Sequence, residues 1–150
     1  MGNLEPLFSS SSSKWETPIE LFKELDKEFG FVLDAAASVD NHLCDTYYTE
    51  QDDGLLQEWR SWTYCNPPYG REVSKWVQKS YEEMRKGNYS VMLLPARTDT
   101  RYFHSYIWDA SVQRPREGVK VRFLKGRLKF SNAKNSAPFP SMIVVFGGGG

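Results

Sequence analysis

Apolar and polar residues follow two spacings along the chain, and the two spacings alternate. Apolar residues at helical spacing predict helices over residues 18–29, 71–86 and 100–110. Short apolar or alternating runs predict strands over residues 31–34, 46–49, 62–65, 89–94, 119–130 and 142–146. This order of elements predicts an α/β fold, in which helices cover both faces of a mostly parallel sheet and a C-terminal antiparallel hairpin completes it.

The first predicted helix has a recognisable beginning. Thr17 stands before Pro18, a residue suited to the first helical position, and Glu20 follows at the third. A Thr with a Glu three residues later forms a capping box, in which each side chain satisfies a free backbone amide. We therefore expect Thr17 to be the N-cap of this helix and Gly30 to end it.

The chain of 150 residues predicts one domain between two short tails. Residues 1–13 end in five serines and are expected to be a flexible, Ser-rich tail. Residues 14–146 carry all the predicted elements and form the single expected domain. Residues 147–150 are all glycine and form the second tail.

Composition narrows the class of protein further. The formal net charge is +0, and no apolar run approaches the ~20 residues that a membrane span needs. The two cysteines, Cys44 and Cys65, form neither a disulfide framework nor a zinc pattern, so we expect no metal and a cytoplasmic location. Aromatic residues reach 15%, which suits either a ring-rich core or surfaces that stack on flat ligands.

Three of the predicted strands end in polar or conformationally special residues. Asp34 ends the first, Asn66 with two prolines follows the third, and residues 95–97 (Pro-Ala-Arg) follow the fourth. In α/β sheets, ligands bind at the carboxyl ends of the strands. We therefore expect these three ends to meet at one cleft.

The most informative of these ends reads Asn66-Pro67-Pro68-Tyr69. The prolines fix two φ angles and remove two backbone donors, but they keep their carbonyl oxygens. Asn66 adds a side-chain acceptor, and Tyr69 adds a flat ring. A rigid group of acceptors beside a ring suits a planar ligand that bears an NH2 group, such as the exocyclic amine of adenine. The alternative is an ordinary turn.

A second candidate feature is a stripe of positive charge. Eight basic residues lie between Arg114 and Lys134, and only Glu117 opposes them. Such a stripe can contact nucleic-acid phosphates with an affinity that depends on salt. The alternative is an exposed strand that carries lysines to prevent edge-to-edge pairing.

Seven stretches of the chain, taken together, resemble the phage-type DNA N6-adenine methyltransferases, which depend on S-adenosylmethionine and carry an NPPY motif. These stretches, which occur in this order, are KWETPIELF, FGFVLDAAAS, DGLLQEW, CNPPYG, LLPARTDTRYFH, GRLKF and APFPSMIVVF. The resemblance implies a Rossmann-like S-adenosylmethionine methyltransferase fold, with residues 14–146 as the catalytic domain. It also implies a site-specific enzyme in a bacterial host, encoded by a phage or prophage.

The implied reaction moves a methyl group from S-adenosylmethionine to the N6 amine of a flipped adenine in double-stranded DNA, by direct displacement. Asn66 and the Pro67 carbonyl would accept hydrogen bonds from N6, and Pro68 would hold the loop. Tyr69 would stack on the target base. Phe139 is the candidate for a second ring, and a packing role as a loop anchor is its alternative.

The cofactor would bind at three segments. The first is the N-terminal segment with Trp15, Thr17 and Pro18, and the second is the turn at Asp34, Ala35 and Ala36. Acidic residues after the second predicted strand would bind the ribose or the adenine amine, and the candidates are Glu50, Asp52 and Asp53. For Asp34, a cap on the following turn is the alternative role.

DNA contacts are expected from basic residues near the cleft, namely Arg97, Arg122, Lys125, Arg127, Lys129 and Lys134. Cys65 is expected to be a small buried residue, and His104 a structural hydrogen-bonding group. Two other functions stay open: the same chemistry on an RNA amine or a protein amide, and a non-catalytic nucleic-acid-binding module. The complete Asn-Pro-Pro-Tyr motif argues against the second.

Overall fold

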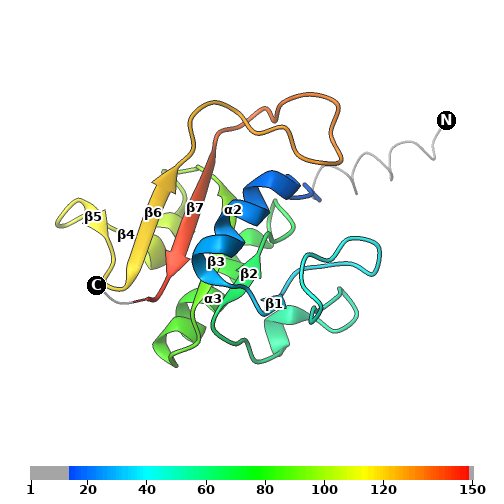
Figure 1. Ribbon diagram of the computed structural model, residues 1–150. Coiled ribbons are helices and arrows are strands. Elements are labelled where there is room, and N and C mark those ends of the chain that lie inside the picture. Colours follow the sequence, from blue (N-terminus) through cyan, green and yellow to red (C-terminus); the bar gives the residue numbers. More distant parts are fainter. Residues whose placement is uncertain (1–13, 149–150) are drawn as a thin grey trace.

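Five strands form one sheet in the order β1-β2-β3-β7-β6 (Figure 1). The structure is a computed structural model that describes residues 14–148, so the expected tail over residues 1–13 and the last two glycines lie outside the described residues. The strands of the sheet are β1 (Leu33–Asp34), β2 (Thr63–Cys65), β3 (Ser90–Pro95), β6 (Val119–Phe123) and β7 (Ser141–Phe146).

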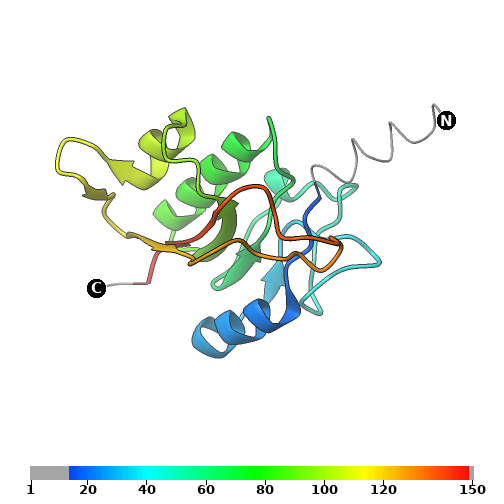
Figure 2. The ribbon, with the colours of Figure 1, turned by 90° about the horizontal axis from the view of Figure 1, so that it is seen from above.

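Strand direction confirms a mostly parallel sheet with a C-terminal antiparallel hairpin. Strands β1, β2 and β3 pair in parallel, while β7 runs antiparallel to both β3 and β6. Four strands therefore point one way, and β7 points the other. Helices α2 (Ile19–Phe29) and α3 (Val73–Arg85) lie on opposite faces of the sheet, as Figure 2 shows.

The centre of the sheet is the centre of the core. Every residue of β3 and β7 is buried, and these strands read as nearly continuous apolar runs. From one side, α2 contributes Phe22 and Leu25, and from the other, α3 contributes Val73, Trp76 and Val77. Helical periodicity therefore predicted both helices correctly.

The expected start of α2 was wrong in one respect. The helix begins at Ile19 with Pro18 at the N-cap position, and no side chain caps it. The Thr17 hydroxyl instead lies 2.6 Å from the hydroxyl of Tyr64 on β2 and accepts a hydrogen bond from Asn66. The Thr17 side chain therefore bonds residues that are distant in sequence, and it does not cap the helix. Gly30, at φ 69°, ends the helix as expected.

The predicted helix over residues 100–110 is shorter than expected. Helical conformation covers residues 101–107, of which η2 (Phe103–Ile107) is π-helical, and β4 (Trp108–Asp109) then pairs with β5 (Arg114–Pro115). The Asp109 carboxylate accepts two hydrogen bonds from Ser111, from its amide at 3.0 Å and its hydroxyl at 2.6 Å. A local Asp-Ser turn thus closes this hairpin and stops the helix.

Three predicted strands are shorter than expected, and the one over residues 31–34 begins only at Leu33. Residues 46–49 provide a single bridge, between Tyr47 and Asp34, and the strand expected over residues 119–130 ends at Phe123. A long loop then leads to β7. No helix among residues 14–148 is both long and apolar enough to cross a membrane.

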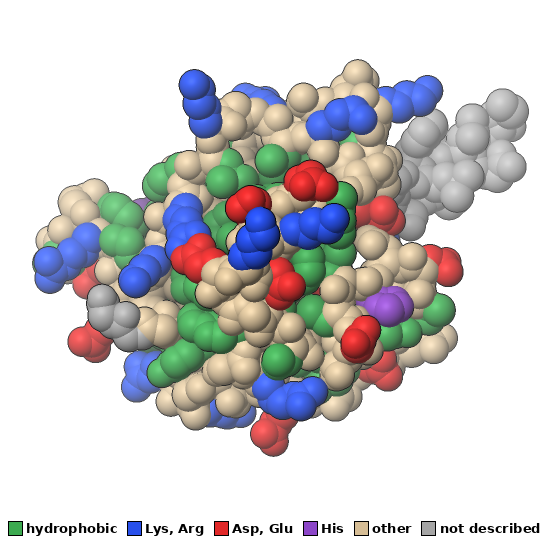
Figure 3. All heavy atoms as spheres, in the orientation of Figure 1, with side chains coloured by type: hydrophobic (Ala, Val, Ile, Leu, Met, Phe, Trp, Pro, Cys, Tyr) green, Lys and Arg blue, Asp and Glu red, His purple; other side chains and the backbone are tan. Residues whose placement is uncertain are grey.

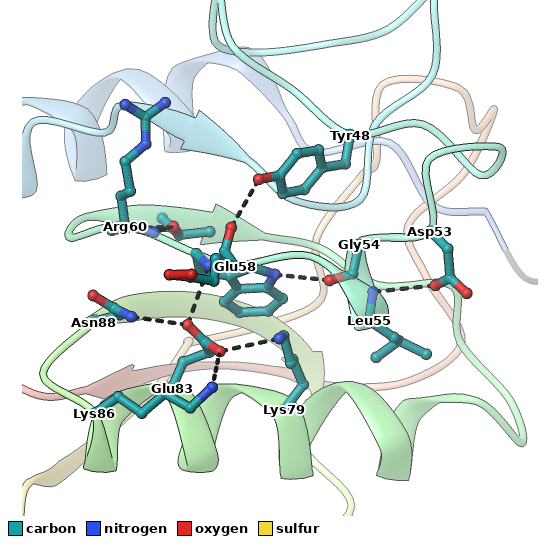
Figure 4. A network of polar contacts seen from close by, with 12 residues as sticks. Tyr48, Asp53, Gly54, Leu55, Glu58, Arg60, Lys79, Glu83, Lys86 and Asn88 are labelled. Carbon is teal, nitrogen blue, oxygen red and sulfur yellow. Dashed lines mark hydrogen bonds and ion pairs between the residues drawn. The ribbon is translucent and has the colours of Figure 1, made fainter.

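A buried carboxylate ties α3 to the segment before β2 (Figure 4). The Glu83 side chain is 1% exposed and accepts the backbone amide of Trp59 at 3.1 Å. Lys79, Lys86 and Asn88 donate to the same carboxylate at 3.0, 3.3 and 3.0 Å. Burial raises the pKa of Glu83, but these hydrogen bonds outweigh it and leave the pKa below the ordinary value. Glu83 is therefore a charged structural anchor.

Candidate active site

The carboxyl ends of β1 and β2 meet at one cavity of about 530 Å³. Asp34 ends β1, and Asn66 follows β2 directly, so the parallel pairing brings both to the same wall. The third expected strand end does not reach the cavity. After β3, the Ala96 amide donates to the Pro140 carbonyl at 2.8 Å. The loop that leads into β7 therefore covers this end.

The side-chain amide of Asn66 is held in one orientation by two acceptors. Its Nδ2 donates to the Trp15 carbonyl and, at 3.1 Å, to the Thr17 hydroxyl. Its Oδ1 is buried and has no hydrogen-bond partner within residues 14–148. An unpaired buried acceptor costs about 1–3 kcal/mol, so this oxygen is suited to receive a donor from a ligand.

The residues after Asn66 form a rigid wall. Pro67, Pro68 and Tyr69 all line the cavity. Within residues 14–148, the Pro67 carbonyl accepts no hydrogen bond. The Tyr69 ring is 8% exposed, and its hydroxyl donates to the Leu93 carbonyl at 3.0 Å. Burial raises the pKa of Tyr69 well above its ordinary value, so this donor stays protonated.

Phe139 lies behind Tyr69 and is not part of the cavity wall. Its ring packs edge-on against Trp15 at 5.3 Å and against Tyr69 at 5.7 Å between centroids. These contacts favour the alternative role of Phe139, an anchor for the loop before β7.

Asp34 is almost fully buried, and its carboxylate accepts two backbone amides. The Leu43 amide donates at 3.0 Å and the Ala36 amide at 3.4 Å. Burial raises the pKa of Asp34 to about 6, against an ordinary value of 3.8. Asp34 therefore caps the turn after β1 and also lines the cavity with Ala35 and Ala36, so both of the roles expected for it remain compatible.

Of the three acidic candidates after the second predicted strand, two line the cavity and one does not. Glu50 and Asp53 line the cavity, and Asp52 does not. Asp52 accepts the Thr49 amide at 2.8 Å and the Thr49 hydroxyl at 3.1 Å, which is a local turn contact. Asp53 accepts the Leu55 amide at 3.1 Å at the start of the short helix η1 (Gly54–Leu56).

Of the three N-terminal residues expected to bind the cofactor, two line the cavity. Trp15 and Thr17 line the cavity, whereas Pro18 turns the chain into α2 and lies outside the wall. The Ser131 hydroxyl donates to the Thr17 carbonyl at 2.9 Å, and the Ser131 amide donates to the Glu16 carbonyl. The long loop after β6 thus holds this segment over the cavity.

The charges on the wall are mainly negative. Its acidic residues are Glu16, Asp34, Glu50, Asp53 and Glu72, and Lys14 is the one basic residue among those that the structure describes. The cavity therefore suits a cation and disfavours a phosphate.

Comparison with known proteins adds the decisive observation. A family model described as "DNA N-6-adenine-methyltransferase (Dam)" matches residues 7–147.

The chain belongs to the Dam family of DNA N-6-adenine-methyltransferases.

Two curated proteins are similar to parts of this Dam-family chain. The DNA N-6-adenine-methyltransferase of Escherichia phage T1 is 37% identical over 92 residues, which cover 59% of this chain and 38% of that protein. The putative methyltransferase YfdM of Escherichia coli strain K12 is 36% identical over 64 residues, which cover 37% of this chain and 70% of that protein. The similar region thus spans well under two thirds of the phage T1 protein.

The basic residues that were expected to contact DNA are not part of the cavity wall of this Dam-family chain. Arg122 is held by Glu28 on α2 through two hydrogen bonds of 2.8 and 2.5 Å, and its guanidinium lies over Phe29. The other expected DNA contacts are exposed and, among residues 14–148, make no side-chain hydrogen bond or ion pair. They are Arg97, Lys125, Arg127, Lys129 and Lys134.

Sequence reasoning missed several residues of the wall. Leu43, Gly54 and Tyr64 line the cavity, and Trp76 on α3 does so too, although its spacing indicated a core position. Tyr64 carried a usable signal, because it stands two residues before Asn66 on a strand whose end was expected at the cleft. Cys65 is buried and His104 bonds the Thr98 carbonyl, as expected.

Proposed function

We propose that this chain transfers a methyl group from S-adenosylmethionine to the N6 amine of adenine in double-stranded DNA. The single observation that carries the mechanism is the buried, unpaired Oδ1 of Asn66 on the wall of the cavity. Family membership supports the substrate and the reaction.

Two preorganised acceptors would bind the amine. Asn66 Oδ1 and the Pro67 carbonyl both lack a donor among the described residues. Accepting hydrogen bonds from the N6 hydrogens draws the nitrogen towards tetrahedral geometry and makes its lone pair nucleophilic. These acceptors also stabilise the positive charge that develops on N6. No carboxylate base is needed beforehand, because the amine becomes acidic only once it has been alkylated.

The cofactor's chemistry fits the residues of the cavity. When bound, S-adenosylmethionine supplies a methyl group on a positively charged sulfur; the N6–carbon bond forms, the carbon–sulfur bond breaks, and a proton leaves N6 for solvent. The acidic wall suits a ligand that carries sulfonium and ammonium charges. Ionised Asp34 would pair with the ammonium, and Glu50 and Asp53 are the remaining candidates for the ribose hydroxyls.

The target base would enter the cavity beside Tyr69. The hydroxyl of Tyr69 is fixed on Leu93, so the ring is held in place before a base arrives. A planar base that has left the duplex can then lie against the ring while its amine reaches Asn66. Phe139, which supports Tyr69 from behind, would keep that ring in position.

The duplex would lie over the basic loop between β6 and β7. Figure 3 shows Lys and Arg side chains along the upper rim of the molecule, over this loop. Their exposed ammonium and guanidinium groups would contact phosphates, and the uncharged base would be the only part of the DNA to enter the acidic cavity. The phage T1 relative supports a phage or prophage origin, with action on DNA in the cytoplasm of a bacterial host.

The test uses purified protein, unmethylated duplex DNA and S-adenosylmethionine with a labelled methyl group. After digestion to nucleosides, chromatography and mass spectrometry identify the labelled base. We expect the label in N6-methyladenine, and mapping of labelled fragments then gives the recognition sequence. RNA and protein acceptors are the control arms, and label in either of them instead of DNA would overturn the assigned substrate.

A further inference from the structure

The side chains of Tyr64, Thr17 and Asn66 form a chain of hydrogen bonds at the wall of the cavity. The Tyr64 hydroxyl lies 2.6 Å from Thr17 Oγ1, and Thr17 Oγ1 lies 3.1 Å from Asn66 Nδ2. Tyr64 is 0% exposed and Thr17 is 6% exposed. Neither hydroxyl caps a helix, so this chain of hydrogen bonds needs another explanation.

The orientation of the Asn66 amide decides what it can bind. Its oxygen and nitrogen have nearly the same shape, but only the oxygen accepts a hydrogen bond from an amine. With the amide turned over, Oδ1 would face the Trp15 carbonyl, and two acceptors would repel each other. The observed orientation gives Nδ2 two acceptors and leaves Oδ1 without a donor among the residues that the structure describes.

Tyr64 keeps the Thr17 hydroxyl available as one of these acceptors. A hydroxyl oxygen has two lone pairs and one proton. If Tyr64 donates to Thr17, a lone pair of Thr17 remains for Asn66; if Thr17 donates to Tyr64, its proton points away from Asn66. Burial raises the pKa of Tyr64 well above its ordinary value, so the phenol stays neutral at every working pH.

We infer that Thr17, held by Tyr64, is a positioning residue that keeps the Asn66 amide oxygen free to accept the substrate amine. This inference rests on the proposed function. It assigns the Thr17 hydroxyl to the orientation of Asn66 and not to the cofactor. The Trp15 carbonyl sets the direction of the amide, and Thr17 adds the second bond that holds it.

The kinetic test compares three variants. Thr17→Val keeps the side-chain shape and removes the hydroxyl, so we expect kcat to fall about tenfold, the effect of removing one hydrogen bond. The KM for DNA and the Kd for S-adenosylmethionine should stay within about threefold, because the hydroxyl holds a catalytic group and not a ligand. Thr17→Ser should restore most of kcat, and Tyr64→Phe should give a smaller loss than Thr17→Val. Unchanged kcat in Thr17→Val would overturn the inference.

Ser131→Ala is the matched control. It removes a 2.9 Å bond to the carbonyl of the same residue, Thr17, and leaves the hydroxyl chain untouched. We expect kcat to stay within about twofold of wild type, because the Ser131 amide still bonds the Glu16 carbonyl and holds the segment, while Thr17 still bonds Asn66. An equal loss of kcat in Ser131→Ala and Thr17→Val would show that anchoring of the segment, and not orientation of the amide, sets the rate.

A second readout does not depend on activity. The side-chain amide protons of Asn66 can be identified by NMR, because their signals disappear in Asn66→Ala. We expect slow exchange with solvent in the wild type and faster exchange in Thr17→Val. Equal exchange rates would contradict the inference even if the enzyme methylates DNA. A wild type that labels no adenine, but shows the exchange difference, would overturn the proposed function and leave the orientation intact.

Discussion

Gly54 lies directly against the backbone carbonyl of Ala35. A Cβ atom at Gly54 would lie 2.3 Å from the Ala35 oxygen and 3.1 Å from the Trp76 ring. The indole N–H of Trp59 donates to the Gly54 carbonyl at 2.9 Å, which fixes the position of the Gly54 backbone. The short helix η1 can therefore pack on the turn after β1 only with glycine at this position.

Gly54→Ala should open the cavity at this contact. Neither neighbour can move cheaply, since one is backbone and the other a buried ring, so we expect a loss of about 1–3 kcal/mol in the free energy of unfolding. The affinity for S-adenosylmethionine should fall as well, because Asp53 and Ala35 move apart. Urea denaturation and calorimetry measure the two effects. Leu56→Ala is the control on the same short helix, because Leu56 is 79% exposed. Equal stability of the two variants would contradict the packing argument.

Asp34 should give stability a specific pH dependence. Its pKa of about 6 in the folded chain exceeds the ordinary 3.8, so the folded state binds this proton more tightly than the unfolded state. The contribution of Asp34 to stability is therefore greatest below about pH 4 and decreases by about 3 kcal/mol as pH rises to about 6 and above.

Comparison of wild type with Asp34→Asn isolates this effect. The variant replaces one carboxylate oxygen by an amide nitrogen, which changes the free energy of unfolding by the same amount at every pH. Because the amide does not ionise, the variant lacks the pH-dependent contribution of Asp34. Urea denaturation between pH 4 and 7 should show the stability difference moving in favour of the variant as pH rises. A difference that does not change with pH would exclude Asp34 as the group responsible.

Glu83 should be one of the costliest buried residues to remove. Glu83→Ala leaves the Trp59 amide and the Lys79 ammonium without their acceptor, and we expect a loss of about 3–5 kcal/mol. Glu83→Gln, which can still accept from Trp59, should lose less. The neighbouring Glu82 is exposed, so Glu82→Ala should change stability by less than about 0.5 kcal/mol. Thermal denaturation of the three variants tests this ranking.

The basic residues should separate into two classes in DNA binding. Replacing Lys125, Arg127 and Lys129 by Ala should weaken binding and reduce the slope of log K against log salt by about 0.9 for each phosphate that is no longer neutralised. Arg122→Ala is the matched control: Glu28 already neutralises Arg122, so the slope should stay the same. Fluorescence anisotropy of a labelled duplex over a salt series measures the slope. A reduced slope in Arg122→Ala alone would reverse the assignment.

Local sequence was sufficient where the structure depends on local physics. The six-residue strands β3 and β7 are buried along their whole length, and α2 and α3 have clear helical faces, so pattern alone located them. The rigid Asn66-Pro67-Pro68-Tyr69 segment was expected at a strand end and lies there, because prolines cannot extend a central strand.

Long-range partners explain what the sequence did not reveal. Thr17 satisfied the local rule for a helix cap, yet its hydroxyl bonds groups 47 and 49 residues away. Asp34 accepts an amide from Leu43, nine residues on, and no periodic pattern marks that turn. Glu50, Asp52 and Asp53 are near neighbours in sequence, and only the folded structure separates their roles. Glu50 and Asp53 face the cavity, whereas Asp52 accepts a hydrogen bond from the Thr49 amide.

The place of β7 has a consequence for synthesis of the protein in the cell. This strand follows β6 along the chain, yet it lies between β3 and β6 in the sheet. Until the ribosome has released it, the apolar strand β3 has an open edge, and such edges invite pairing with other chains. A nascent chain would therefore need protection, for example by a chaperone, until β7 has left the ribosome. A premature stop before Ser141 would leave the sheet without its middle.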